Sequence, residues 1–328
     1  MNNFQSVSRA RDVSQRLANG LIAATPVPFD ANGKLHEAGY ESYLRHMVHQ
    51  PVSGVAVWAH TGRGLKLEGD TARRVLRGWR EALPETVIVA GVGSLDSDLD
   101  RARSGTLAMA EAAAHLGADA LLVYPPTWLR GHSRANQLIV EHHAHLAHVG
   151  LPIILFYLYE AAGGIAYGPQ VLDELLALPN VIGIKMATLD SVMTYQDVAR
   201  QMRDRNPEKL FITGEDRFLG YSLQRGARAA LIGMGAICCD LQADLIKANA
   251  AGDSARFLAL SDAVDMLAET IFIRPMEGYI RRLLWALVHL GVIPLEAAHD
   301  PWAPPLASDE FENIGKTLNA LALITQEC

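Results

Sequence analysis

The sequence has few cysteines, no long apolar run and no excess of positive charge, and each of these absences excludes a class of protein. Its three cysteines, Cys238, Cys239 and Cys328, are an odd set without the spacing of metal ligands, which favours a reducing cytosol. No window approaches the roughly 18–20 apolar residues of a membrane-spanning helix. The net charge of −7 argues against nucleic acid or an anionic membrane surface as the main partner.

Targeting and phosphate-binding signals are also missing. Residues 1–19 contain Arg9, Arg11 and Arg16 but lack the apolar segment of a signal peptide. Gly91-Val92-Gly93 follows an apolar run, yet Asp96 stands where a dinucleotide-binding motif has its third glycine, and no Walker sequence occurs. We therefore expect a cytoplasmic protein without a nucleic acid or membrane partner.

What the sequence does contain is a short apolar run that recurs eight times. Half of its 328 residues are hydrophobic, which is enough for a sizeable core. The runs are 21–24, 55–58, 87–90, 120–123, 153–156, 181–184, 210–212 and 229–232. The first five are spaced by about 33 residues, which leaves room for one strand, one helix and two short loops in each unit.

Helical periodicity fills the segments between the runs, as in the repeat of small and apolar residues over 107–117. Eight strand–helix units in succession predict an α/β fold, a single (β/α)8 TIM barrel over residues 20–252. An open, doubly wound sheet is the alternative, but the missing phosphate-binding motif disfavours it. Residues 1–19 are expected to form an N-terminal extension with a further helix, and residues 253–328 a C-terminal extension of three helices packed on the barrel.

A lysine at the end of the sixth run is the most informative residue of the chain. Residues 181–184 read as a strand buried on both faces, and Lys185 follows them directly. In a (β/α)8 barrel the active site lies at the carboxyl ends of the strands. Burial lowers the pKa of a lysine placed there, and a neutral amine is a nucleophile for carbonyl carbon. Lys185 is therefore a candidate for Schiff-base formation; the alternative is a structural lysine that reaches solvent and pairs with a carboxylate.

Two other strand ends supply polar groups to the same end of the predicted barrel. The turn His60-Thr61-Gly62 follows the second run, and its backbone amides and hydroxyl can hold a carboxylate. Tyr157 and Tyr159 follow the fifth run and offer phenols that can carry a proton. Each feature also has a plainer interpretation: an ordinary turn with a capping threonine, and aromatic residues that fill the barrel mouth.

Six motifs in register give the chain a family resemblance. They are residues 25–33, 60–63, 90–94, 183–188, 213–216 and 300–306. The chain resembles the dihydrodipicolinate synthase and N-acetylneuraminate lyase family of pyruvate-type class I lyases, from Gly20 almost to the C-terminus. Residues 183–188 (Gly-Ile-Lys-Met-Ala-Thr) correspond to the family's Schiff-base lysine motif. The turn at residues 60–63 falls where the family has a Thr-Thr-Gly-Glu turn that grips the substrate carboxylate.

The resemblance implies a Schiff-base-forming lyase of the aldolase type. Its substrate would be a small-molecule 2-oxo acid, such as pyruvate or a pyruvate-derived aldol, and Lys185 would attack the keto carbon. No metal or organic cofactor is implied, because the iminium itself stabilises the enamine. His60, Thr61 and Gly62 would bind the carboxylate, and Leu231 matches an apolar residue that lines the family's pyruvate pocket. The family's tetramers, which are built from two dimers, imply a homo-oligomer, either a dimer or a homotetramer.

The sequence departs from the family at the end of the fifth strand, where family members carry a catalytic tyrosine. Counting forward from Leu151-Pro152 places that tyrosine at Phe156, whereas counting back from Lys185 places it at Tyr157. Because phenylalanine has no ionisable proton, we assign the proton relay to Tyr157. The family's arginine for the second substrate's carboxylate is absent from residues 160–164, which argues against the lysine-biosynthesis reaction.

Two other functions stay open. A dehydratase of a sugar-derived 2-keto-3-deoxy acid would keep the lysine and change the specificity loops. A non-catalytic relative would bind an oxo acid as a sensor, since a fold does not settle a function.

Other clusters are interpreted as structural. His142, His145 and His148 recur at spacings of three, which is compatible with metal ligands, but they fall on a predicted outer helix away from the barrel mouth. We interpret them as a solvated or interface face and expect no metal site. Cys238-Cys239 are interpreted as buried small residues.

Overall fold

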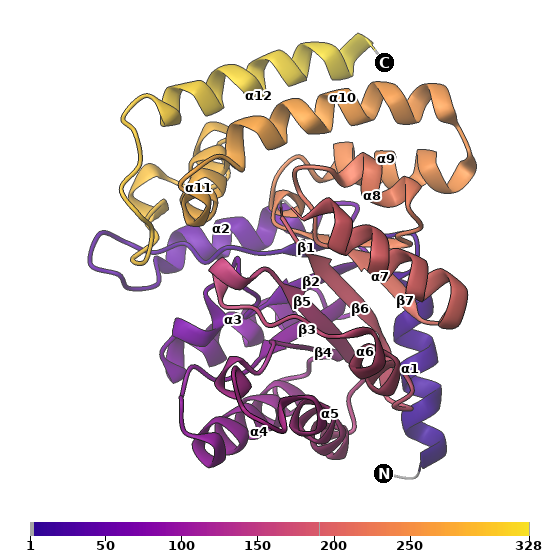
Figure 1. Cartoon of the computed structure of the whole chain (residues 1–328). Coiled ribbons are helices and arrows are strands. Elements are labelled where there is room, and N and C mark those ends of the chain that lie inside the picture. Colours follow the sequence, from indigo (N-terminus) through magenta and orange to yellow (C-terminus); the bar gives the residue numbers. More distant parts are fainter. Residues whose placement is uncertain (1–2, 190, 328) are drawn as a thin grey trace.

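The structure, a computed structural model, describes residues 3–189 and 191–327; Cys328 lies outside them. It confirms the predicted barrel (Figure 1). The strands are β1 (Leu21–Ala24), β2 (Gly54–Val57), β3 (Val87–Val92), β4 (Ala120–Val123), β5 (Ile153–Leu158), β6 (Val181–Ala187), β7 (Leu210–Thr213) and β8 (Ala229–Ile232). Each strand pairs in parallel with the next, and β8 pairs with β1 to close the barrel. Each of the eight apolar runs falls on one strand.

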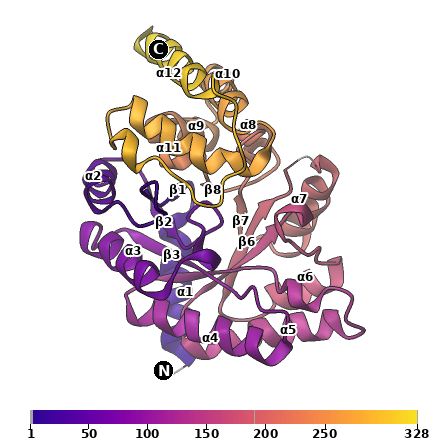
Figure 2. The same cartoon turned by 90° about the vertical axis from the view of Figure 1, so that its left-hand side faces the viewer.

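Helices alternate with the strands and surround them (Figure 2). They are α2 (Glu37–Met47), α3 (Gly69–Ala82), α4 (Leu99–His115), α5 (Ala135–Leu146), α6 (Pro169–Leu176), α7 (Val192–Arg205), α8 (Leu219–Gln224) and α9 (Cys239–Ala251). Short 3₁₀ turns complete several loops, among them η1 (Gly64–Lys66) after β2 and η4 (Glu160–Ala162) after β5.

The inside of the barrel is filled by alternate residues of the strands, because successive side chains of a strand point to opposite faces. This interior cluster includes Ile22, Ala24, Ala56, Val87, Val89, Ala120, Leu122, Ile154, Phe156, Ile182, Leu210, Ile212, Ala229 and Leu231. Their neighbours on the same strands point outward and pack against the helices. Both faces of each strand are therefore apolar, which is why the strands read as unbroken hydrophobic runs in the sequence.

The helix α1 (Asn3–Leu17) covers the amino ends of the strands. Its residues Ala10, Val13 and Leu17 join the interior cluster, and the Arg9 side chain donates a hydrogen bond to the Ala118 carbonyl at 3.1 Å. The helix expected in residues 1–19 is thus confirmed for the described part, and it leaves the opposite end of the barrel as the accessible one.

The C-terminal extension contains the three expected helices, α10 (Ser254–Ile271), α11 (Tyr279–His289) and α12 (Glu310–Glu327), gathered on one side of the barrel (Figure 1). Arg282 of α11 is fully buried and donates hydrogen bonds to the Glu310 carboxylate at 2.6 Å and to the Ile273 carbonyl at 2.9 Å. These bonds tie the turn after α10 to α11 and α12. The short helix η6 (Met276–Gly278) lies in this turn, beside the carboxyl end of the barrel.

None of the helices in the described part of the chain has both the length and the apolar character needed to cross a bilayer.

Candidate active site

Lys185 stands near the end of β6 and points to the inside of the barrel. It lies in register with Phe156 of β5 and Ile212 of β7, which both belong to the interior cluster. Its side chain is 6% exposed, and its Nζ lies 4.2 Å from the centre of the Phe156 ring. Gly214 makes room for the lysine, because a Cβ at that position would approach the Lys185 Cε to 2.5 Å.

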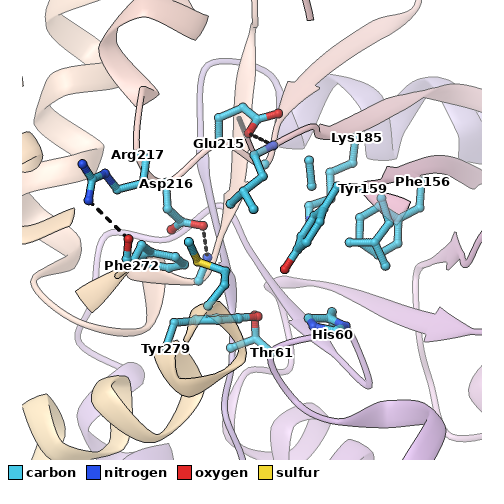
Figure 3. A pocket seen from close by; sticks show the side chains of 16 residues that line it. His60, Thr61, Phe156, Tyr159, Lys185, Glu215, Asp216, Arg217, Phe272 and Tyr279 are labelled. Atoms are coloured by element: carbon cyan, nitrogen blue, oxygen red, sulfur yellow. Dashed lines mark hydrogen bonds between the residues drawn. The ribbon is translucent and has the colours of Figure 1, made fainter. Parts of the chain in front are cut away.

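The Lys185 side chain lines a pocket at the carboxyl end of the barrel (Figure 3). The turn after β2 contributes His60 and Thr61, and β5 with its following turn contributes Phe156, Leu158 and Tyr159. The wall also includes Ala187, Leu189, Gly214, Glu215, Asp216, Arg217, Gly233, Phe272, Met276 and Tyr279. The structure therefore brings three of the sequence-predicted site residues, Lys185, His60 and Thr61, into one cavity.

The pairing of the strands contradicts the assignment of the proton relay to Tyr157 and places Phe156 at that position instead. Ile153 pairs with Val181 but Ile154 pairs with Gly183, so Ile182 of β6 is an extra residue that shifts the pairing, and Phe156 lies opposite Lys185 and Tyr157 opposite Met186. Paired residues of parallel strands point to the same face. Tyr157 therefore faces the surrounding helices, where its ring contacts Tyr167 edge-on, and it does not line the pocket. The expected phenol is replaced by a phenylalanine ring.

The turn after β2 presents one hydroxyl and one imidazole to the pocket. The Thr61 hydroxyl lies 3.0 Å from the phenol oxygen of Tyr279, and the His60 Nε2 lies 2.9 Å from a Glu277 carboxylate oxygen. The Gly62 amide donates to the Ala59 carbonyl within the turn at 3.0 Å, so its role is to shape the turn. Leu231 is buried on β8 in the interior cluster and lies outside the set of residues that line the pocket.

An ion-pair cluster joins this turn to the C-terminal extension. Arg63 is buried and donates to Glu277 and to Asp300, in each case at 2.7 Å. Burial by itself would raise the pKa of Glu277, but hydrogen bonds and charge from His60 and Arg63 outweigh it and lower that pKa to about 2. Glu277 is therefore ionised at neutral pH and holds η6 against the barrel.

Two acidic residues follow β7 and border the pocket. Burial raises the pKa of Glu215 to about 7, against hydrogen bonds from Thr188 and Leu189. Burial also raises the pKa of Asp216 and lowers that of Lys185, while the opposite charges of these two residues partly offset the effect of burial. A larger share of the lysine is thus neutral near pH 7 than for a lysine in water, as nucleophilic attack on a carbonyl requires.

The extension contributes pocket residues that the sequence interpretation missed. Phe272, Met276 and Tyr279 line the cavity, and the Tyr279 ring stacks on Phe272 with ring centres 4.7 Å apart. No local motif marks these residues in the sequence. The amphipathic stripe of α11 indicates a packed helix, but only the tertiary contact shows which of its residues reach the barrel mouth.

A second hollow of about 300 Å³ adjoins the pocket and shares His60 and Leu158 with it. Its wall includes Arg63, Lys66, Ser94, Tyr124, Thr127, Glu277 and the small residues 161–163. These small residues belong to the segment 160–164, which contains no arginine, so no long side chain from this segment fills the hollow.

The histidines interpreted as structural lie apart from the pocket on α5 and the turn after it. The expectation of a solvated or interface face is wrong for His142, which is buried beside His143 and packs edge-on against Trp128. The ring centres of His145 and His148 lie 5.6 Å apart. No group of three or more histidine, cysteine, aspartate or glutamate side chains within residues 3–189 and 191–327 is arranged to hold a metal ion. Cys239 is buried, Cys238 is half-buried, and neither forms a disulfide.

Known proteins resemble this chain over nearly all of its length. The 4-hydroxy-tetrahydrodipicolinate synthase of Xanthomonas axonopodis pv. citri is 27% identical over 304 residues, which cover 89% of this chain and 94% of that protein. The synthase of the same name from Pseudomonas aeruginosa is 25% identical over 309 residues, or 92% of this chain and 99% of its own.

Solved structures share the fold at lower identity. The sialic acid aldolase of Ruminococcus gnavus superposes with a TM-score of 0.80 at 18% identity, covering 95% of this chain and 99% of the other. YagE, a prophage protein of the dihydrodipicolinic acid synthase family from E. coli K12 crystallised with pyruvate, has a TM-score of 0.80 at 20% identity and covers 93% of this chain and 98% of its own.

A family model also matches the chain over nearly this whole span. The model described as the dihydrodipicolinate synthetase family matches residues 17–321. This chain belongs to the dihydrodipicolinate synthetase family.

Proposed function

We propose that this protein is a Schiff-base-forming lyase that acts on a 2-oxo acid, such as pyruvate or a pyruvate-derived aldol. The observation that carries the proposal is a buried lysine at the carboxyl end of β6 that faces a pocket and whose pKa is lowered by burial. Its neutral amine adds to the keto carbon and expels water to form an iminium. Withdrawal of electrons by the iminium then stabilises an enamine at the next carbon, so the reaction needs no metal or organic cofactor.

The turn after β2 is proposed to hold the carboxylate of the substrate. Thr61 offers a hydroxyl and His60 an imidazole in the same pocket as Lys185, and a fixed carboxylate places the adjacent keto carbon next to the amine. Gly62 shapes this turn through its bond to Ala59. Leu231 supports the barrel interior next to Ile22 of β1 and is not assigned a substrate contact.

The adjoining hollow favours a substrate longer than pyruvate. It offers the hydroxyl groups of Ser94 and Thr127 and the ammonium of Lys66, while residues 160–164 supply no arginine. Hydroxyl and ammonium groups suit a polyhydroxylated chain as well as an acid. This observation keeps the dehydratase of a 2-keto-3-deoxy sugar acid as a second candidate. A homo-oligomer, a dimer or a tetramer, remains part of the proposal, by analogy with the family.

Turnover of a panel of substrates tests the proposal. The purified protein is incubated with pyruvate-derived aldols and with 2-keto-3-deoxy sugar acids, and the products are identified by NMR. Release of pyruvate supports the lyase, whereas loss of water with the carbon chain intact supports the dehydratase. Binding without consumption of any acid in the panel contradicts both and indicates a sensor. Lys185→Ala is the control, and its folding is checked by thermal unfolding.

A further inference from the structure

The pocket lacks the phenol expected beside Lys185 but contains a carboxyl group for which the proposed chemistry has not yet given a role. Asp216 follows β7, and it lines the same cavity as Lys185 (Figure 3). Two backbone amides hold its carboxylate in place: Met234 donates at 2.7 Å and Gly233 at 3.4 Å. Part of its surface stays accessible, so the group is fixed by the end of β8 without being sealed off from the cavity.

Glu215, its neighbour in sequence, is engaged differently. Both of its carboxylate oxygens accept hydrogen bonds from the loop after β6: Thr188 donates through its hydroxyl at 2.8 Å and Leu189 through its amide at 3.1 Å. Glu215 is 2% exposed. Its buried carboxylate thus fixes the backbone that follows Lys185, whereas Asp216 stays partly accessible, and this difference in exposure leaves Asp216 as the better placed acid for chemistry in the cavity.

The phenols of the cavity are committed to other partners. The Tyr159 hydroxyl donates to Glu277 at 3.4 Å, and the Tyr279 hydroxyl lies 3.0 Å from that of Thr61. Burial raises the pKa of Tyr279 well above its ordinary value, which makes its phenolate a rare species near neutral pH. A group that moves protons works best when its pKa lies near the working pH.

We propose that Asp216 is the proton relay of this site, in place of the family's tyrosine. Once Lys185 has formed the iminium, the Asp216 carboxylate removes a proton from the adjacent carbon. The electrons of that C–H bond form the carbon–carbon double bond of the enamine, and the π electrons of the iminium move onto the lysine nitrogen. The protonated carboxyl group returns the proton when the enamine is quenched, so the relay consumes nothing. The inference rests on the proposed Schiff-base function.

The electrostatic surroundings of Asp216 agree with this role. Lys185 is the cation that interacts with it, and the negative charge of Asp216 also contributes to the raised pKa values of Glu215 and Tyr279. Burial raises the pKa of Asp216, against the bonds from Met234 and Gly233 and the charge of Lys185. When the lysine nitrogen becomes an iminium, a positive charge remains beside the carboxylate, and this charge favours the ionised form that acts as the base.

Asp216→Asn separates imine formation from proton transfer. Two readouts are compared: borohydride trapping of pyruvate on the protein, which reports the imine, and exchange of the pyruvate methyl protons in D2O by NMR, which reports the enamine. We expect trapping to persist and exchange to fall at least about a hundredfold, the usual contribution of a general acid–base group. The ratio of exchange to trapping, which cancels the titration of Lys185, should rise with pH in the wild type as the carboxyl group ionises, and the variant should lose this rise. Tyr159→Phe and Tyr279→Phe are the matched comparisons that remove a competing phenol.

Asp216→Ala with added formate is the second variant, because a small carboxylate that enters the vacated space should restore exchange if the role is chemical. Wild-type exchange by Asp216→Asn, or loss of exchange only in a tyrosine variant, overturns the relay while leaving the Schiff base intact. A wild-type protein that neither traps nor exchanges any 2-oxo acid overturns the proposed function itself, and the relay with it.

Discussion

Two lysines of the barrel, the buried Lys185 and the half-buried Lys209, show how position along the chain decides what an ammonium group does. Lys209 directly precedes β7, at the amino end of the barrel, and its Nζ donates to the Val181 carbonyl at 2.6 Å. Lys185 stands at the other end and faces a ring and a cavity instead. Burial lowers the pKa of both, but of the two only Lys185 borders the pocket at the carboxyl end of the barrel, whereas Lys209 lines a surface hollow at the amino end. The two residues therefore form a natural test and control.

At the same scale, Tyr157→Phe should leave activity unchanged. The Tyr157 side chain faces Tyr167 and the outer helices, so its hydroxyl has no route to a substrate on Lys185. Turnover and borohydride trapping of the variant are compared with those of the wild type. A large loss of turnover in a variant that still folds and traps would return the relay to Tyr157.

The sequence identifies Lys185 but cannot identify its partner on β5. Lys185 can be recognised because it directly follows the apolar run 181–184 and lies within the family's lysine motif at residues 183–188. Which residue of β5 lies opposite Lys185, in contrast, depends on the extra residue of β6, Ile182, beside Ile153 and Ile154. Such an extra residue shifts every later pairing of the two strands by one, and nothing in the local sequence marks the place where it occurs.

At the scale of elements, the site depends on the contact between the turn after β2 and the helix η6. Arg63 reaches Glu277 in η6 and Asp300 beyond α11, and Thr61 meets Tyr279 at the start of α11. The polar contacts lie beside apolar ones from Phe272 and Met276. The extension therefore acts as one wall of the pocket rather than as a separate appendage.

Glu277→Gln should loosen this wall and destabilise the fold by about 1–2 kcal/mol at neutral pH. The estimate is modest because Glu277 is 35% exposed and Asp300 remains as a partner for Arg63. The folded protein lowers the pKa of Glu277 from 4.5 to about 2. Its stabilising contribution is therefore present above pH 4.5 and is lost as the pH falls toward 2.

Thermal unfolding of the wild type and of Glu277→Gln, followed across this pH range, measures the effect. The difference in melting temperature should be largest above pH 4.5 and shrink below it. Glu312→Gln, at an exposed position of α12, should show no such difference. A gap between wild type and Glu277→Gln that stays constant down to low pH would contradict the assigned ion pair.

At the scale of the whole molecule, the barrel and the extension share a core. One continuous cluster of buried apolar side chains runs from Leu21 and Val55 on the strands to Leu267, Leu283 and Ile314 on the C-terminal helices. The boundary predicted at residue 253 falls in the turn between α9 and α10, but the apolar packing continues across it. A domain division there stays a prediction.

This shared core should make the protein unfold in a single cooperative step. Removing the extension from the barrel would expose apolar surface on both, so neither part should remain folded without the other. Differential scanning calorimetry and the loss of helical circular dichroism should show one transition at the same temperature by both methods. Two resolved transitions would indicate that the extension folds independently.

The barrel itself is the part that the sequence predicts best, because a unit repeated eight times gives eight chances to recognise it. The run lengths, the helical segments between them and the closing of a parallel sheet follow from local patterns. Phe272, Met276 and Tyr279, which form one wall of the pocket, lie more than 80 residues after Lys185 in the chain. Local sequence patterns cannot predict contacts between segments that far apart.

Borohydride reduction with peptide mapping tests the central claim most directly. The protein is reduced in the presence of pyruvate or a longer 2-oxo acid, digested, and the modified lysine is located by mass spectrometry. We expect a single adduct on Lys185, retained in Lys209→Ala and absent from a folded Lys185→Ala. No adduct with any acid, or an adduct on Lys66 in the adjoining hollow in place of Lys185, would contradict the account.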